Sequence, residues 1–218
     1  MGNDTFDKEY DLGATTLVRP RGHDFAMYVT PRYRHHYEAC EYERFTARLL
    51  ARVVRRCSLF IDVGANYGFY SFLAATSHPQ IEVVALEPVP ETAQIFERSQ
   101  KSLGLNRVRL HHLAASDADG TARFNISQSA DNCSFYPHPA APPLRQMDVQ
   151  TARLDTMLAD HAPAATLVKI DVDGHELAVL RGMSGLFNRF PDLTLVIEFN
   201  PKMQEAAGAK PEIGRAHV

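Results

Sequence analysis

Cysteine is scarce in this sequence, and its spacing argues against two kinds of site. The 218 residues include three cysteines, Cys40, Cys57 and Cys133, and none of them forms a C-x-x-C pair. An odd number without paired spacing argues against a disulfide framework and fits a reducing cytoplasm. His36 and Cys40 have the spacing of half a metal site on one helix face, but no second pair follows. We therefore expect no bound metal.

Long apolar runs and an excess of one charge are also missing. No stretch approaches the roughly 18 apolar residues of a membrane-spanning helix, and the polar start Met1–Phe6 does not resemble a secretory signal. Lysine and arginine number 23 against 26 aspartate and glutamate, a net charge of −3 that argues against a nucleic-acid partner. A hydrophobic content of 45% with 22% charged residues is typical of a soluble globular domain.

The chain is organised around Leu59–Phe72, where an apolar run meets a glycine turn. The run reaches Asp62, and Gly64, Asn66 and Gly68 then follow at alternate positions. This pattern predicts a buried strand, a tight turn and the first turn of a helix. Such a turn can hold a ligand, because free backbone N–H groups and the helix dipole converge there.

The acid within this motif bears on which ligand is held. Asp62 would repel a pyrophosphate, but it suits a ligand with a cationic amine or sulfonium. S-adenosylmethionine carries both of these charges and no phosphate. The alternative is an ordinary strand-to-helix turn, whose glycines only permit close packing.

Strand and helix patterns alternate along the rest of the chain, which predicts a doubly wound, mainly parallel α/β sheet. The segment 127–145 is rich in proline and polar residues and predicts a long loop beside the substrate, with Phe135 and Tyr136 as contacts. In the helix over 35–56, Phe45, Leu49 and Val53 recur at helical spacing and are predicted to form the inner face. In the last helix, Leu177, Leu180 and Phe187 are predicted to face the core. Strands are predicted over 15–18, 25–30, 59–62, 81–86, 108–115, 121–126, 147–153, 166–170 and 193–199, and helices over 35–56, 69–75, 91–103, 155–160 and 176–190.

Polar residues follow three further predicted strands, where open α/β sheets bind ligands. Glu87 lies 19 residues beyond Gly68 and can accept hydrogen bonds from both ribose hydroxyls of an adenosine. At the end of the next predicted strand, the stretch Ala114-Ala115-Ser116-Asp117 is predicted to border the adenine. Asp171 directly follows the strand predicted over 166–170.

Two more acids follow Asp171 and have two possible roles. Asp173 and Glu176 have capping-box spacing, so either they satisfy the N–H groups that open the next helix or they serve the site.

Together these stretches resemble the FkbM family of S-adenosylmethionine-dependent methyltransferases. The resemblance implies a Rossmann-like class I methyltransferase fold and methyl transfer to hydroxyl groups of sugars, glycans or secondary metabolites. Asp173 stands where the family usually has glutamate. The resemblance is carried by 60–68, 85–91, 167–177, 180–182 and 195–198.

The resemblance also assigns roles to individual residues. It implies that Asp62, Gly64, Asn66 and Gly68 hold the methionine part of the cofactor, and that Glu87 holds the ribose. Methyl transfer to a hydroxyl requires alignment and a proton acceptor. The candidates for that acceptor are Asp171 first and His175 second.

The same patterns predict the domain organisation. Residues 1–57 are expected to form an N-terminal segment on the substrate side, 58–200 the methyltransferase domain, and 201–218 a tail. The last six residues, 213–218, match one reading frame of a sequencing-library adapter. We therefore expect a sheet truncated after its fifth strand and a foreign end.

Two other functions compete with this prediction. A nicotinamide-dependent Rossmann oxidoreductase of the short-chain type needs Tyr-x-x-x-Lys, and no tyrosine here has lysine at that distance. Hydrolase chemistry lacks a G-x-S-x-G motif. A cofactor-binding module without an acceptor site is the non-enzymatic alternative, and only a methylated product separates it from an enzyme.

Overall fold

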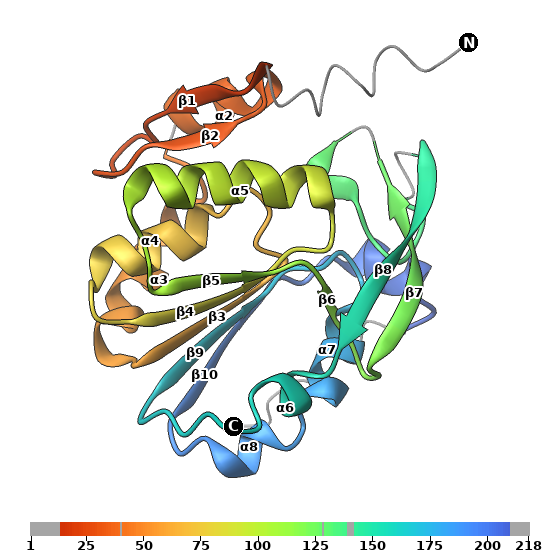
Figure 1. Ribbon diagram of the computed structural model, residues 1–218. Coiled ribbons are helices and arrows are strands. Elements are labelled where there is room, and N and C mark those ends of the chain that lie inside the picture. The colour runs from red at the N-terminus through yellow and green to blue at the C-terminus, as the bar shows by residue number, and fades with distance from the viewer. Residues whose placement is uncertain (1–13, 40, 128, 139–141, 210–218) are drawn as a thin grey trace, which may run out of the picture.

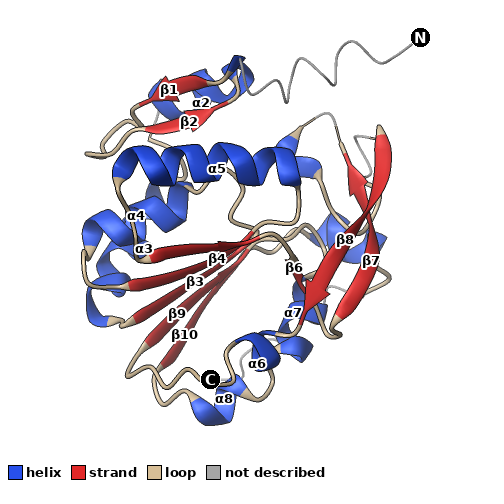
Figure 2. Cartoon of the chain, viewed as in Figure 1, coloured by secondary structure: helices blue, strands red, loops and turns tan. Residues whose placement is uncertain are grey.

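A computed structural model describes residues 14–39, 41–127, 129–138 and 142–209. Its centre is a five-stranded parallel sheet in the order β10-β9-β3-β4-β5, with helices on both faces (Figures 1 and 2). The doubly wound α/β prediction is confirmed. The strands are β1 (Thr16–Val18), β2 (Met27–Val29), β3 (Leu59–Val63), β4 (Glu82–Leu86), β5 (Val108–His111), β6 (Ala114–Ala115), β7 (Gly120–Ile126), β8 (Arg145–Ala152), β9 (Thr166–Ile170) and β10 (Leu193–Ile197). The helices are α2 (Arg34–Glu38), α3 (Arg44–Val53), α4 (Phe69–Ser77), α5 (Pro90–Leu103), α6 (Leu154–Met157), α7 (Glu176–Gly182), α8 (Leu186–Arg189) and α9 (Pro201–Ala206), with 3-10 turns at Pro31–Tyr33, Val54–Arg56 and Ala130–Asn132.

The two central strands, β3 and β9, are buried along their whole length. Both are continuous apolar runs broken by one charged residue each, as strands covered on both faces of a parallel sheet usually are. From β3 the chain first builds β4 and β5 on one side, and then crosses to build β9 and β10 on the other. The strand order therefore reverses between β3 and β9, and ligands of open α/β sheets bind at such a switch point.

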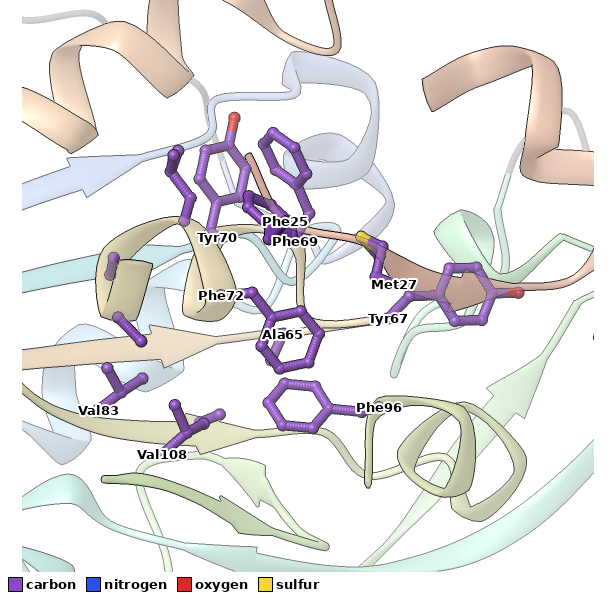
Figure 3. Packing of buried hydrophobic residues seen from close by; sticks show 14 of the residues in the cluster. Phe25, Met27, Ala65, Tyr67, Phe69, Tyr70, Phe72, Val83, Phe96 and Val108 are labelled. Atoms are coloured by element: carbon purple, nitrogen blue, oxygen red, sulfur yellow. The ribbon is translucent and has the colours of Figure 1, made fainter. Parts of the chain in front are cut away.

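Each face of the sheet has its own apolar core. On one face, α3, α4, α5 and the β1–β2 hairpin pack together, and Figure 3 shows the Phe72 and Phe96 rings of this core beside each other, with centroids 4.8 Å apart. The hairpin lies over α5 (Figure 1), where the backbone N–H of Tyr28 donates to Ser99 Oγ at 2.8 Å. On the other face, the packing residues come from α6, α7 and α8.

The predicted helix over 35–56 is wrong in its continuity and in its inner face. The structure has α2 and α3 separated by a break at Glu43, whose φ is 39°. The break turns Tyr42 into the core, where its ring lies 4.7 Å from Tyr37 and 5.0 Å from Phe69. Consequently Phe45, predicted to face inward, is 78% exposed.

Two further predictions are corrected. The strand predicted over 108–115 is divided: β5 pairs with β4 of the main sheet, whereas β6 pairs with β8 of a separate three-stranded sheet. The helix predicted over 176–190 is divided into α7 and α8. Its buried residues are Val179, Met183 and Leu186, whereas Leu177 and Phe187 are exposed.

The far edge of the main sheet is β10, which pairs with β9 in the part of the chain that the structure describes. The predicted foreign residues 213–218 lie outside the described residues. None of the described helices combines the length and apolar character needed to cross a membrane.

Candidate active site

A cavity of about 460 Å³ lies at the carboxyl ends of β3, β4, β9 and β10. Elements far apart in sequence line it: the glycine turn, the loops that follow the other three strands, the segment between α2 and α3, and part of the loop before β8. Seven carboxylates line it, but Lys169 is the only lysine or arginine among the described lining residues. The cavity therefore favours cationic ligands and hydrogen-bond donors over phosphates. The lining carboxylates are Glu41, Glu43, Glu87, Asp131, Asp171, Asp173 and Glu198.

The glycine turn lies against the end of β9. Gly64 has a φ of 78°, and a Cβ atom built on it would lie 1.9 Å from the backbone oxygen of Asp171. Only glycine fits both the left-handed backbone and this close approach. Gly64 and Asn66 line the cavity, and the Oδ1 atom of Asn66 is buried without a hydrogen-bond partner.

Gly68 stands at the start of α4, behind the turn. A Cβ atom there would lie 2.6 Å from the rings of Phe72 and Phe96, the pair seen in Figure 3. The residue is outside the cavity lining. Its lack of a side chain therefore serves the packing of α4 on α5, which was the alternative interpretation for a glycine of this motif.

Asp62 is buried beneath the turn rather than in the cavity wall. Its carboxylate accepts a hydrogen bond from Ser71 Oγ at 2.7 Å, and its Oδ1 atom lies 3.9 Å from Lys169 Nζ. Burial raises the pKa of the Asp62 carboxyl, while the Lys169 ammonium and the Ser71 hydroxyl oppose that rise. Asp62 therefore does not line the cavity itself but contacts Lys169, which does.

Glu87 lines the cavity at the end of β4 and is nearly buried. Its two carboxylate oxygens accept the backbone N–H groups of Asn66 and Val89, each at 2.9 Å. Burial raises the pKa of the Glu87 carboxyl to about 7, although these two bonds oppose the rise. Glu87 therefore connects the glycine turn to the end of β4 and keeps lone pairs for a ligand.

Asp171 lines the cavity at the end of β9 but is already engaged. Lys169 Nζ lies 2.8 Å from its Oδ2 atom, and Glu198, at the end of β10, shares a hydrogen bond with it. Burial works to raise the pKa of Asp171, but the Lys169 ammonium and the hydrogen bonds from Glu198 and Lys169 together outweigh it and hold the pKa below its ordinary value. The hydrogen bond to Asp171 and burial together raise the pKa of Glu198 to about 9, so Glu198 is the protonated partner at neutral pH.

His175, Ser116 and Asp117 lie together outside the main cavity. His175 Nε2 is 3.0 Å from Ser116 Oγ, and its ring stacks on Phe135 with centroids 4.0 Å apart. Burial lowers the pKa of His175 to about 4, so the ring is neutral at pH 7. With Tyr136, His175 and Asp117 line a smaller cavity of about 220 Å³.

The segment between the small sheet's strands reaches across the glycine turn. Asn66 Nδ2 donates to Asp131 Oδ1 at 3.0 Å, and the hydroxyl of Tyr33 lies 2.5 Å from Ser129 Oγ. Of the two aromatic contacts predicted in this segment, Phe135 lines the main cavity and Tyr136 does not. Of the two predicted substrate contacts, one therefore lies at the main cavity and the other at the smaller cavity.

The sequence prediction did not single out several lining residues. Glu43 comes from the break between α2 and α3, Asp131 from the loop before β8, and Glu198 from the end of β10. A signal existed only for Glu198, an acid near the end of the strand predicted over 193–199; in the structure that strand ends at Ile197, directly before Glu198. Among the described residues, the non-glycine residues with positive φ are Glu43, Asn66 and Asp173, and all three line this cavity. Backbone strain of this kind gathers at functional sites.

Comparison with known proteins identifies relatives. The family model described as the methyltransferase FkbM domain matches residues 62–214. Methyltransferase 1 of Beauveria bassiana is 24% identical over 180 residues, covering 73% of this chain and 72% of its own. Hexuronic acid methyltransferase AglP of Haloferax volcanii is 29% identical over 65% of this chain and 56% of its own. 31-O-demethyl-FK506 methyltransferase FkbM of Streptomyces tacrolimicus is 29% identical over 65% of this chain and 66% of its own.

This chain therefore spans less than two thirds of the length of two of these three relatives. Among solved structures, the FkbM methyltransferase of Methylobacillus flagellatus matches with a TM-score of 0.46 and 16% identity, over 63% of this chain and 32% of its own. The S-adenosylhomocysteine-bound methyltransferase PaMTH1 of Podospora anserina matches with a TM-score of 0.47 and 10% identity, over 79% of this chain and 60% of its own.

Proposed function

The chain belongs to the FkbM methyltransferase family, and from that premise we propose that it methylates a hydroxyl group of a sugar, glycan or secondary metabolite. The cofactor of this family is S-adenosylmethionine, which supplies an electrophilic methyl group on a sulfonium. The observation that carries the proposal is the wall of carboxylates around the cavity at the switch point between β3 and β9.

The residues present suit this cofactor. The buried Asn66 Oδ1 atom has no donor, and an ammonium group such as that of the methionine part would supply one. We propose that Gly64 and Asn66 hold the methionine part, and that Asp62 and Gly68 support the turn from behind. Ala114 and Ala115 line the cavity beside the turn, so we propose that they, rather than Ser116 and Asp117, border the adenine.

The cavity should prefer S-adenosylmethionine and S-adenosylhomocysteine to NAD by at least tenfold in affinity. Two phosphates of NAD would face carboxylates with only Lys169 to offset them, and Lys169 is already paired with Asp171. Isothermal titration with the three compounds measures the order. Tighter binding of NAD would contradict the proposal and favour an oxidoreductase.

We propose that Glu87 accepts hydrogen bonds from the ribose hydroxyls. Replacing Glu87 by alanine should weaken S-adenosylmethionine binding by about 1.5–3 kcal/mol, because charge-assisted hydrogen bonds are lost. Calorimetric titration measures the change. Glu82→Ala is the matched control, since Glu82 begins the same strand, pairs with Arg109 on the surface and lies outside the cavity lining. An affinity equal to that of the control would mean that Glu87 does not contact the cofactor.

The acceptor end of the cavity supports a hydroxyl-rich substrate. Glu43, Asp171 and Asn200 line it, and their oxygens can accept hydrogen bonds from several hydroxyl groups. Transfer of a labelled methyl group to a panel of methyl glycosides tests the enzymatic function. Cofactor binding without a methylated product from any hydroxyl compound would favour the non-catalytic alternative.

We also propose that the protein works in the cytoplasm without a nucleic-acid partner. Cys57 is buried as a free thiol, and thiols of this kind are stable in a reducing compartment. The net charge of −3 and the acidic cavity oppose binding of a phosphate backbone. Fractionation of the source cells and an electrophoretic shift assay with RNA and DNA test these two points, and a membrane or nucleic-acid association would overturn them.

A further inference from the structure

Asp173 occupies a distinctive position in the loop between β9 and α7. It lines the main cavity, and its backbone is left-handed, with a φ of 46°. The next residue, Gly174, is pressed against α9, since a Cβ atom there would lie 2.6 Å from the backbone oxygen of Met203. Close packing thus holds the loop in a conformation that costs an aspartate about 1–2 kcal/mol.

This aspartate does not cap the helix that follows. The N-cap residue of α7 is His175, and no side chain caps that end. Instead, Glu176 accepts the backbone N–H groups of Val172 and Gly174 at 3.4 and 3.2 Å and is hydrogen-bonded to Gln204. The capping-box alternative therefore fails for Asp173. No hydrogen bond or ion pair to its carboxylate is present among the described residues.

The two residues that the sequence singles out as proton acceptors, Asp171 and His175, are both already bound to other side chains. Asp171 is held by Lys169 at 2.8 Å and by Glu198, and it is a weak base because its pKa is depressed. His175 is outside the lining of the main cavity, and its ring is held by the contacts with Ser116 and Phe135. Asp173 is the neighbouring group whose acceptor oxygens stay open to the cavity.

The surroundings of Asp173 also suit it to receive a proton near neutral pH. The charged and titratable groups that face it are Asp171, Glu176 and Asp131, with Glu198 beside them. Burial, and then repulsion from the three aspartate and glutamate groups, raises the pKa of Asp173 to about 7. A general base is most effective when its pKa lies near the working pH.

We propose that Asp173 is the base that takes the proton from the acceptor hydroxyl during methyl transfer. This inference rests on the proposed function. The hydroxyl oxygen forms the new bond to the methyl carbon, and the carbon–sulfur bond breaks with its electron pair staying on sulfur, which becomes a neutral thioether. The proton of the hydroxyl passes to the Asp173 carboxylate and is later released to water.

The proposal places Asp173 beside the methyl group and therefore close to the sulfonium charge. A positive charge about 5 Å away favours the ionised carboxylate strongly enough to move the pKa of Asp173 well below 7. At pH 7, where Asp173 is about half protonated, S-adenosylmethionine should release up to about half a proton more than the uncharged thioether S-adenosylhomocysteine.

Isothermal titration of the full chain in two buffers of different ionisation enthalpy measures this excess of released protons. Asp173→Asn should lower it clearly, and the part that remains would come from Glu87, whose pKa is also about 7. Glu198→Gln is the matched control: Glu198 lines the same cavity and is already neutral at pH 7, so the excess should persist. An excess that is absent from the wild type, unchanged in Asp173→Asn or lost in Glu198→Gln overturns the proposal. Failure of S-adenosylmethionine to bind would instead overturn the proposed function.

A second readout concerns the reaction itself. With methyl α-glucoside as the probe acceptor and labelled S-adenosylmethionine, the wild-type rate should rise with pH to a plateau above about 7, because the base must be deprotonated. At saturating S-adenosylmethionine, Asp173→Asn should lower the rate about 10²–10⁴-fold. It should weaken binding of S-adenosylmethionine, which carries the sulfonium charge, and leave the affinity for the uncharged S-adenosylhomocysteine within about threefold of the wild type. A variant that keeps the rate and the rising limb excludes Asp173 as the base.

Discussion

Replacing Gly64 by alanine is expected to lower the free energy of unfolding by about 3 kcal/mol or more and to abolish cofactor binding. The φ of 78° costs an L-residue about 1–2 kcal/mol. The new Cβ atom would lie 1.9 Å from the backbone oxygen of Asp171, which must move for the variant to fold. Overpacking of this kind costs about 1–3 kcal/mol in well-packed sites, and here it separates the ends of β3 and β9 at the cavity.

Two other glycines separate the causes of this loss. Gly104→Ala tests backbone strain alone: its φ is 65°, but no atom lies within 4 Å of the added Cβ, so a loss of about 1–2 kcal/mol is expected. Gly182→Ala tests steric conflict alone, because the Cβ would lie 1.9 Å from the backbone oxygen of Ser116 in a helix that tolerates alanine. Denaturant unfolding and calorimetric titration measure all three. A Gly64→Ala protein as stable as Gly104→Ala would show that β3 and β9 do not approach as described.

The sequence predicted the main sheet well because its strands carry a strong local signal. β9 was predicted with the bounds that the structure has, since the mainly apolar run Thr166–Ile170, interrupted only by Lys169, ends abruptly at Asp171. α5 was predicted to within one residue, because Gly104 closes it in the left-handed conformation. Local sequence patterns failed where the pairing partner of a strand decides which sheet the strand joins. Apolar residues recur from Val108 to Ala115, so the stretch was predicted as one strand, but its first half pairs with β4 and its second half with β8.

The helix errors have a similar cause. A period of 3.6 residues identifies an apolar stripe only while the helix is unbroken. The chain breaks at Glu43, so that Tyr42 can enter the core, and again after Gly182, which is packed against Ser116. After each break, a different set of residues faces the core. The predictions that placed Phe45 and Phe187 inside therefore failed.

The candidate site could be predicted only in part. Glu87 and Asp171 follow strands, and the carboxyl ends of parallel strands meet at one edge of the sheet, so their place in the cavity followed from position alone. The side on which Asp62 lies could not be predicted, because a strand buried on both faces has no polar alternation to orient it. Glu43 and Asp131 reach the cavity through folding of distant segments, which no local pattern specifies.

Replacing Lys169 by methionine is expected to lower the free energy of unfolding by about 3–5 kcal/mol, because removing one partner of a buried ion pair leaves the others uncompensated. Lys169 is 5% exposed. Its ammonium lies 2.8 Å from Asp171 Oδ2, 3.9 Å from Asp62 Oδ1 and 4.8 Å from the centre of the Tyr70 ring. Burial works to lower the pKa of Lys169, but the two carboxylates outweigh it and raise that pKa. Methionine keeps the length of the side chain, so the loss is electrostatic rather than a cavity.

The pH dependence of the loss distinguishes this cause from poor packing. Without the ammonium, the folded-state pKa of Asp62 and of Asp171 rises, so the folded variant binds more protons than the unfolded chain. Its stability should therefore increase as the pH falls from 8 to 5, and the deficit relative to the wild type should shrink.

Adding Asp62→Asn to Lys169→Met should recover part of the loss. Arg109→Met, which removes a surface cation paired with Glu82 at 2.7 Å, should cost about 1 kcal/mol or less at every pH. Urea unfolding of the four proteins at several pH values decides the matter: a deficit that is independent of pH and unrelieved by Asp62→Asn would mean that Lys169 contributes packing, and that the charge of Asp62 is balanced elsewhere.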